Sequence, residues 1–382
     1  MFLLLLACRA PTSAADSRNS IADPRGAFFD LDTWIDSERA AVGIPGLAVA
    51  VVHGGAVVHT AGFGLADIDL SEPVTTDTPF MLASVSKTVI GVSVAEAADA
   101  GTLDLDADIN TFLPFAIDNP LVDETAITTR QLATHTGSIR DNSMVENSNY
   151  SDGDSPIAME DYVEGYLVPG GQWYNALGNF DKWLPGTTYE YSNMGATLLA
   201  RSVEAVDGRD FADVCETDIF APIGMTNTHW HLSQFLDPTL VAMPYDTSTG
   251  TPVADGRYGY PDYPDGGLRA SAADMGRYLA AVSTGGMLDG VQVIPAAAVS
   301  TMLTQQISPD VAAGQGLIWY SYDVGGRTVW GHNGSDYGVA TEIGFDPTTG
   351  DGFIVLLNTD WSSAVNPTVA TIEERLMEEV AG

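Results

Sequence analysis

Strand-like segments lie near both ends of this sequence, and the long stretch between them has none. Residues 47–53 and 56–62 are short runs rich in β-branched residues, joined at Gly54-Gly55, which is a strong hairpin signal. Alternating apolar segments return only late in the chain, at residues 316–322, 328–331, 339–345 and 352–358. The pattern predicts an α+β fold, in which one antiparallel sheet is built from both chain ends, flanked by helices, and carries an inserted, mainly helical lobe.

Helical periodicity supports the same division of the chain. Apolar residues recur at helical spacing over residues 28–41, 84–100 and 367–380, whereas short helical pieces and loops fill residues 104–264. The length of 382 residues suits one large domain or two interleaved lobes. We expect a domain over residues 25–382, with a sheet lobe from residues 25–103 and 265–382 and a helical lobe from residues 104–264.

The first residues resemble part of an export signal. Met1 to Cys8 are mostly apolar, and a polar stretch follows, so residues 1–24 are interpreted as a signal remnant and tether. Leu5-Leu6-Ala7-Cys8 also resembles a bacterial lipoprotein cleavage box, although the basic segment that usually comes first is missing. We expect an exported protein, periplasmic or extracellular, whose only membrane contact would be a lipid on Cys8.

The charge balance excludes one class of partner. The chain has 51 acidic and 15 basic residues, a net charge of −36, and therefore no basic surface with which to bind nucleic acid. Lysine occurs only twice, as Lys87 and Lys182. Two origins remain open for this composition: a source that lives in high salt, or an acidic exported protein from another habitat. In either case a retained lysine suggests a function.

Several motifs that suggest metals or nucleotides are incomplete. Asp104, Asp106 and Asp108 imitate the start of a calcium loop, but the required glycine and final glutamate are replaced by Ile109 and Phe115. The sequence His229-Trp-His231 lacks a third ligand, and no H-E-x-x-H, P-loop or G-x-S-x-G motif occurs. We therefore expect no metal and no cofactor.

The segment Ser84-Val-Ser-Lys87 stands at the predicted start of a helix. Residues three apart share a helix face, so the hydroxyl of Ser84 and the amine of Lys87 can lie within hydrogen-bond distance. Burial lowers the pKa of an amine, and a neutral amine can accept the proton of a serine nucleophile. The positive end of the helix also favours negative charge on an attacked carbonyl. The segment therefore predicts nucleophilic catalysis.

Two later segments carry candidate partners of this serine. Tyr191 and Asn193 follow a Pro-Gly turn and precede a helical run, which places a phenol and an amide side by side on a loop. The segment that contains His332, Gly334 and Ser335 is expected between strands, where its small residues would let a substrate backbone approach a sheet edge.

In these motifs the sequence resembles the serine penicillin-recognising family, which includes class C β-lactamases, DD-peptidases, D-aminopeptidases and related esterases. The family's S-x-x-K, Y-x-N and K/H-x-G motifs appear in order as Ser84/Lys87, Tyr191/Asn193 and His332/Gly334. The resemblance implies that Ser84 is the acylated nucleophile, that Lys87 and Tyr191 transfer protons, and that Asn193, His332, Gly334 and Ser335 bind substrate. It also implies an oxyanion hole made of the backbone N–H groups of Ser84 and Ser335. An earlier His135-Thr-Gly-Ser138 segment is out of order for the third motif, so His135 is interpreted as structural.

The resemblance leaves three functions open. The first is a serine hydrolase that acts through an acyl-enzyme on Ser84 on a peptide, of the D-amino-acid or DD-carboxypeptidase type, or on a carboxylic ester. The second is a β-lactamase, which is disfavoured because His332 stands where most β-lactamases carry lysine, so the cation for the substrate carboxylate is weaker and depends on pH. The third is a non-catalytic penicillin-binding sensor. The expected partner is a small molecule or a peptide, and the sequence does not indicate an oligomeric state.

Overall fold

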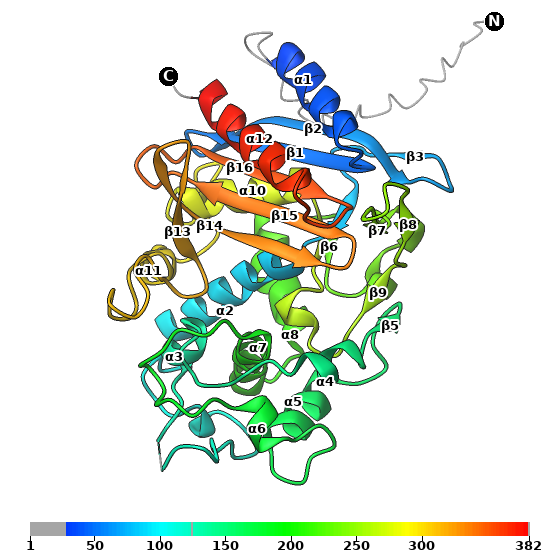
Figure 1. Cartoon of the computed structure of the whole chain (residues 1–382). Coiled ribbons are helices and arrows are strands. Elements are labelled where there is room, and N and C mark those ends of the chain that lie inside the picture. The colour runs from blue at the N-terminus through cyan, green and yellow to red at the C-terminus, as the bar shows by residue number, and fades with distance from the viewer. Residues whose placement is uncertain (1–27, 124, 381–382) are drawn as a thin grey trace, which may run out of the picture.

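The fold is built around one large antiparallel sheet, seen in a computed structural model that describes residues 28–123 and 125–380 (Figure 1). The sheet has seven strands in the order β13-β14-β15-β16-β1-β2-β3. Their bounds are β1 (Gly46–His53), β2 (Ala56–Asp67), β3 (Glu72–Pro73), β13 (Tyr320–Val324), β14 (Arg327–Asp336), β15 (Val339–Phe345) and β16 (Gly352–Leu357). The central pair is β16 with β1, which joins the two ends of the chain in register from Leu47 opposite Leu357. This arrangement confirms the predicted fold class.

Helices cover both faces of the sheet (Figure 1). The terminal helices α1 (Phe28–Ala41) and α12 (Val365–Val380) pack on one face, and α10 (Ala272–Ser283) packs on the other. Strand β1 shows why this requires two apolar layers: Leu47 and Val49 belong to the core under the terminal helices, while Ala48 and Ala50 belong to the core on the opposite face. Successive side chains of a strand point to opposite faces of the sheet. Because helices cover both faces here, both sets of side chains are buried and apolar.

The middle of the chain forms a mainly helical region below the sheet in Figure 1. Its helices are α3 (Thr129–Ala133), α4 (Ser143–Asn147), α5 (Met159–Leu167), α6 (Ala176–Asn179), α7 (Asn193–Asp207), α8 (Phe211–Cys215) and α9 (Ala221–Ile223). Helix α2 (Lys87–Asp99) lies between this region and the sheet and packs on α7 and on α11 (Ala296–Met302). The remaining strands are short: β4 (Pro79–Met81), β10 (Arg269–Ser271) and β6 (Thr228–His229) form one small sheet, and β5 (Ser151–Asp152), β7 (Tyr245–Asp246), β8 (Val253–Ala254), β9 (Tyr258–Gly259), β11 (Met287–Leu288) and β12 (Val291–Gln292) form two-stranded pairs.

Two predicted elements differ from the structure in ways that affect the site. The helix expected over residues 84–100 begins with a 3₁₀ turn, η1 (Ala83–Ser86), and only then continues as α2. The segment of His332, Gly334 and Ser335, expected between strands, lies inside β14 and pairs with β15. It is poor in β-branched residues, and pairing with a neighbouring strand, rather than local preference, makes it extended.

Some predictions lie outside this description. The signal remnant, the tether over residues 1–24 and the lipid on Cys8 fall among residues that the structure does not describe. The boundaries of the two lobes remain predictions. Within the described ranges, no helix has both the length and the apolar character that crossing a membrane requires.

Candidate active site

Ser84 and Lys87 meet at the junction of the 3₁₀ turn and α2. The Lys87 ammonium donates to the Ser84 hydroxyl at 3.0 Å and to the backbone carbonyl of Asp265 at 2.5 Å. The preceding residue, Ala83, has a φ of +45°, which is rare for a residue with a side chain and marks local strain of the kind that gathers at active sites. The geometry predicted for the S-x-x-K segment is therefore present, with Lys87 fully buried.

The charge state of Lys87 differs from the expectation. Burial lowers the pKa of its ammonium, but the electrostatic influence of Tyr191, Asp265 and Asp141 raises it, and the net shift is upward. The expected lowering of the Lys87 pKa is therefore wrong, because desolvation is outweighed by nearby groups that favour the cation. In the free protein Lys87 is a charged donor to Ser84.

Strand β14 runs beside the 3₁₀ turn and brings a second backbone donor to Ser84. The N–H of Asn333 donates to the Tyr320 hydroxyl, on the side of β14 away from β15. Backbone direction alternates along a strand, so the N–H of Ser335, two residues later, points to the same side. Ser84 and Ser335 line one pocket, and the first N–H groups of a helix have no acceptor within it. Two backbone donors can thus converge on an oxyanion.

Gly334 is required for this approach. A Cβ at Gly334 would lie 2.4 Å from the carbonyl oxygen of Leu82 and 3.1 Å from the nitrogen of Ser84. The side chain of Thr341 holds the same Leu82 carbonyl with a hydrogen bond of 2.6 Å. The glycine therefore lets the turn that carries Ser84 lie against β14, rather than only making room for a substrate.

Replacing Ser335 by proline tests the second donor. Because this N–H points away from β15, proline removes the donor without removing a bond of the sheet. We expect Ser335→Pro to lower kcat by about a hundredfold, the scale on which loss of one oxyanion donor acts. Ser335→Ala keeps the N–H and serves as the matched control, with a much smaller loss expected. Steady-state kinetics and thermal melting of both variants provide the test, and a folded Ser335→Pro enzyme with full activity would refute the assignment.

Tyr191 is placed beside Lys87 by the start of helix α7. The Lys87 nitrogen lies 5.2 Å from the centre of the Tyr191 ring. Ser192 caps the helix by accepting from the Gly195 N–H at 2.9 Å, and Asp141 accepts from the Asn193 N–H at 2.8 Å. The Tyr191 hydroxyl is buried and has no hydrogen-bond partner among the described residues. Tyr191 therefore presents a free phenol group next to the Ser84–Lys87 pair.

His135 lies directly behind Tyr191, a position that the sequence did not indicate. The two rings stack with their centres 4.3 Å apart, and the Nδ1 atom of His135 accepts from the Ser192 N–H at 3.2 Å. Burial, and then the charge of Lys87, lower the pKa of His135 well below its ordinary value, so its ring is neutral. His135 is thus a positioning residue for Tyr191, consistent with its interpretation as structural.

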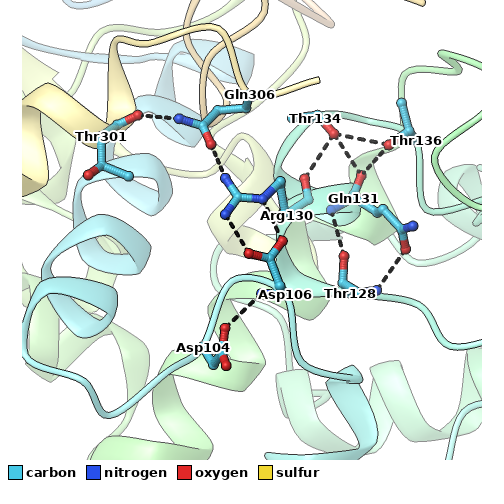
Figure 2. Close-up of polar contacts among 9 residues, drawn as sticks. All are labelled: Asp104, Asp106, Thr128, Arg130, Gln131, Thr134, Thr136, Thr301 and Gln306. Atoms are coloured by element: carbon cyan, nitrogen blue, oxygen red, sulfur yellow. Dashed lines mark hydrogen bonds and ion pairs between the residues drawn. The ribbon is translucent and has the colours of Figure 1, made fainter. Parts of the chain in front are cut away.

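Figure 2 shows how the short helix α3, which leads into the turn of this histidine, is held in place. Thr128 and Gln131 form a capping box at the start of α3. Arg130 donates to both carboxylate oxygens of Asp106, at 2.7 and 2.8 Å, and also to the side chain of Gln306. These contacts connect α3, which leads to His135 and so to Tyr191, with Asp106 and Gln306 in two distant parts of the chain.

His332 is buried in β14 and is not the cation that its sequence position suggested. Its Nδ1 donates to the Asn333 carbonyl at 2.6 Å, so the bare Nε2 is an acceptor, and Nε2 has no partner within the described ranges. Burial lowers the pKa of His332 to about 3, and the charge of Lys87 acts in the same direction. The expectation of a pH-dependent cation near neutral pH is therefore wrong.

The low pKa of His332 predicts how KM depends on pH, and this dependence distinguishes a neutral His332 from one that becomes charged near neutral pH. Since the imidazole becomes mostly protonated only below about pH 3, KM for a neutral ester and for an anionic peptide should show no step from His332 between pH 5 and 8. KM measured against pH for the wild type and for His332→Asn should give parallel profiles. A step in KM near pH 6.5 that disappears in His332→Asn would contradict the buried, neutral state.

A pocket of about 70 Å³ opens beside Ser84 and is lined mainly by polar groups. The predicted residues Ser84, Asn193 and Ser335 belong to its lining, whereas Tyr191 and His332 do not. The rest of its lining was not identified in the sequence and comprises Ala83, Glu146, Tyr150, Tyr260, Asp262, Asp265, Gly266 and Asp336. These residues come from segments far apart in the chain, so no local pattern could have indicated them.

The incomplete metal motifs remain apart from this site. His229 is paired with Glu216 at 3.2 Å, and His231 lies 4.0 Å from Asp154. In residues 28–123 and 125–380, no group of three or more His, Cys, Asp or Glu side chains could hold a metal ion.

Comparison with known proteins agrees with this architecture. The sequence model of the Beta-lactamase family matches residues 31–372, which is most of the chain. The chain therefore belongs to the beta-lactamase family of serine hydrolases. It is 28% identical over 374 residues to "Penicillin-binding protein 4" of Amycolatopsis lactamdurans, an alignment that covers 93% of this chain and 91% of the relative.

Solved structures show the same fold. A D-alanine carboxypeptidase from Burkholderia cenocepacia superposes with a TM-score of 0.68 at 22% identity and covers 92% of this chain and 99% of its own. A D-amino acid amidase from Ochrobactrum anthropi, solved with L-phenylalanine, gives a TM-score of 0.71 at 19% identity and covers 92% and 100%. A class C beta-lactamase from Rhodobacter sphaeroides gives 0.67 at 24% identity, with 92% and 99% covered.

Proposed function

We propose that this protein hydrolyses a peptide or a carboxylic ester through an acyl-enzyme on Ser84. The observation that carries the proposal is the 3.0 Å hydrogen bond between Lys87 and Ser84 at the start of a helix, opposite the backbone of Ser335 on β14. A nucleophile in contact with a charged partner, with two backbone donors nearby, has the parts that acyl transfer requires.

The proposed reaction has two steps. The Ser84 oxygen attacks the substrate carbonyl and passes its proton to the Lys87–Tyr191 pair, and the bond to the leaving nitrogen or oxygen breaks as that atom takes a proton from the pair. Water then attacks the acyl-enzyme, the acid leaves, and Ser84 regains its proton. Because Lys87 is held as a cation, the pair can accept the Ser84 proton only when Tyr191 is a phenolate. We therefore favour the Tyr191 phenolate as the proton acceptor, and Lys87 as the charge that stabilises the developing alkoxide.

Two features favour a peptide or ester over a β-lactam. His332 is neutral, so it offers no cation to the carboxylate of a penicillin. The pocket beside Ser84 has no Lys, Arg or His in the lining that the structure describes. The β-lactamase and the penicillin-binding sensor remain the alternatives. Asn193, Gly334 and Ser335 are the proposed substrate contacts, with His332 beside them, and the proposed partner is a small molecule or peptide met outside the cytoplasm, after export.

Turnover of a substrate panel tests the proposal. The panel contains p-nitrophenyl esters of varied chain length, a peptide that ends in D-Ala-D-Ala, and nitrocefin. We expect kcat/KM for the best ester or peptide to exceed that for nitrocefin by at least about tenfold. Equal or faster turnover of nitrocefin would favour the β-lactamase. A stable adduct with nitrocefin and no turnover of any substrate would favour the sensor.

A further inference from the structure

The pocket beside Ser84 is strongly acidic. Its lining contains four carboxyl groups and, among the described residues, no basic side chain. They come from three separate segments, which carry Glu146, the neighbours Asp262 and Asp265, and Asp336. The nearest cation is Lys87, whose donated bonds go to the Ser84 hydroxyl and to a backbone carbonyl rather than to any of these carboxylates.

Two of the four carboxyl groups, the buried Asp262 and the half-buried Glu146, receive no hydrogen bond from another side chain in the described ranges. Asp262 is only 5% exposed and lines the pocket, and within the described part of the chain its carboxylate has no hydrogen bond or ion pair other than one from its own backbone N–H. The Oε1 atom of Glu146 is also buried with no partner there. By contrast, Asp336 accepts from the Tyr150 hydroxyl at 2.9 Å. The charged form of a buried carboxylate is destabilised when few groups donate to it. A donor on a bound molecule would therefore stabilise the charged forms of Asp262 and Glu146.

The local charge balance identifies the kind of donor. Burial, and after it the neighbouring carboxylates, raise the pKa of Asp262 to about 7 and that of Glu146 to about 8. A cation in the pocket would relieve both effects. Because the described side chains form no metal site, the cation that fits is an organic ammonium, which needs acceptors around it but no fixed coordination shell.

The position of the pocket identifies the part of the substrate it holds. The leaving group must face the Lys87–Tyr191 pair that protonates it, and neither residue of this pair lines the pocket. The pocket lies instead beside Asn193 and Ser335, so it receives the acyl side of the substrate. Its volume of about 70 Å³ suits an ammonium on a short carbon chain.

We propose that Asp262 and Glu146 bind the ammonium group of an aminoacyl substrate, so that the enzyme prefers peptides, amides or esters whose acyl part carries a free amino group. This inference rests on the proposed acyl-enzyme function. It assigns the substrate's amino group to a pocket that repels the carboxylates of penicillins.

The test compares alanine p-nitroanilide, in its D and L forms, with the N-acetyl and N-succinyl derivatives of the same compounds. The derivatives keep the leaving group and change only the charge of the acyl side. We expect kcat/KM for the free amine of one enantiomer to exceed that of its N-acetyl derivative by about tenfold to a hundredfold, and the anionic N-succinyl derivative to be poorer still.

Variants of the pocket then show which residues produce the preference for a free amino group. Asp262→Asn keeps the shape of the side chain and should lower the ratio of kcat/KM for the free amine over the N-acetyl derivative by at least about tenfold. Glu146→Gln, on a less buried side chain, gives a second measurement if Asp262→Asn does not fold. Glu204→Gln is the matched control, because Glu204 also has a pKa raised by burial to about 7 but lines a different cavity. It should keep the wild-type ratio.

The outcomes separate this inference from the function on which it rests. Turnover of p-nitrophenyl acetate that disappears in Ser84→Ala, together with equal kcat/KM for free and acetylated amines, would overturn the inference and leave the proposed function intact. A preference unchanged in both Asp262→Asn and Glu146→Gln would overturn the assignment of the pocket. Absence of turnover with every ester and anilide would overturn both proposals.

Discussion

Ser84→Ala should reduce kcat by roughly a millionfold, because it removes the atom that forms the acyl-enzyme and leaves only binding and the oxyanion donors. The change deletes one oxygen, so the 3₁₀ turn and helix α2 should remain folded. KM should change little, since Asn193 and the rest of the pocket lining are untouched. Steady-state kinetics on the best substrate of the panel, with highly purified protein, provides the measurement.

A matched control accompanies this variant. Ser300→Ala removes a hydroxyl from an exposed position in helix α11 and should keep wild-type kcat. Loss of activity in both variants would indicate that the variant proteins are misfolded or poorly prepared, rather than that Ser84 has a specific role. A Ser84→Ala enzyme within tenfold of the wild type would mean that Ser84 is not the nucleophile.

Lys87→Ala is expected to have the second largest effect, lowering kcat by about a hundredfold to ten thousandfold while KM changes much less. The ammonium touches Ser84 directly, so its charge acts mainly on the alkoxide that forms during attack. Removing it also leaves Asp265 and Asp141 without their nearby cation, which should lower the free energy of unfolding. Kinetics and thermal melting on the same preparation separate the two effects.

The other lysine supplies the control. Lys182 is exposed and lies outside the pocket, so Lys182→Ala should leave kcat and the melting temperature close to those of the wild type. Near-normal kcat in Lys87→Ala would remove this residue from the mechanism, whatever its effect on stability.

The sequence predicted the parts of the fold that depend on local patterns. The hairpin at Gly54-Gly55 appears as β1 and β2, and the first predicted helix has the observed bounds of α1. The S-x-x-K segment predicted the contact of Ser84 with Lys87 because residues three apart share a helix face. These features follow from the chain itself, without knowledge of its partners in space.

Features that depend on tertiary pairing were not predicted. Strand β14 continues through His332 and Ser335 because β15 pairs with it, although glycine, asparagine and histidine favour strands poorly. The charge states of Lys87 and His332 were misjudged for a related reason. Each depends on burial and on charges brought in by other segments, and the sequence shows neither.

The acidic pocket is the clearest example of a site that local sequence does not reveal. Glu146, Asp262 and Asp336 are three of 51 acidic residues, and nothing in their local sequence distinguishes them from the others. They become a candidate binding site only because the fold brings them beside Ser84 and leaves Asp262 and Glu146 without a side-chain donor among the described residues. The acidic composition, from which we expect no nucleic-acid partner, therefore also makes the residues of this pocket hard to recognise in the sequence.

The most direct test of the acyl-enzyme on Ser84 is the intact mass of the protein after treatment with a fluorophosphonate, which labels activated serines. One adduct per chain is expected, located by peptide mapping to the peptide that contains Ser84, and no adduct is expected on Ser84→Ala. An adduct of the same mass on Ser84→Ala, or one mapped to another residue of the wild type, would contradict the account.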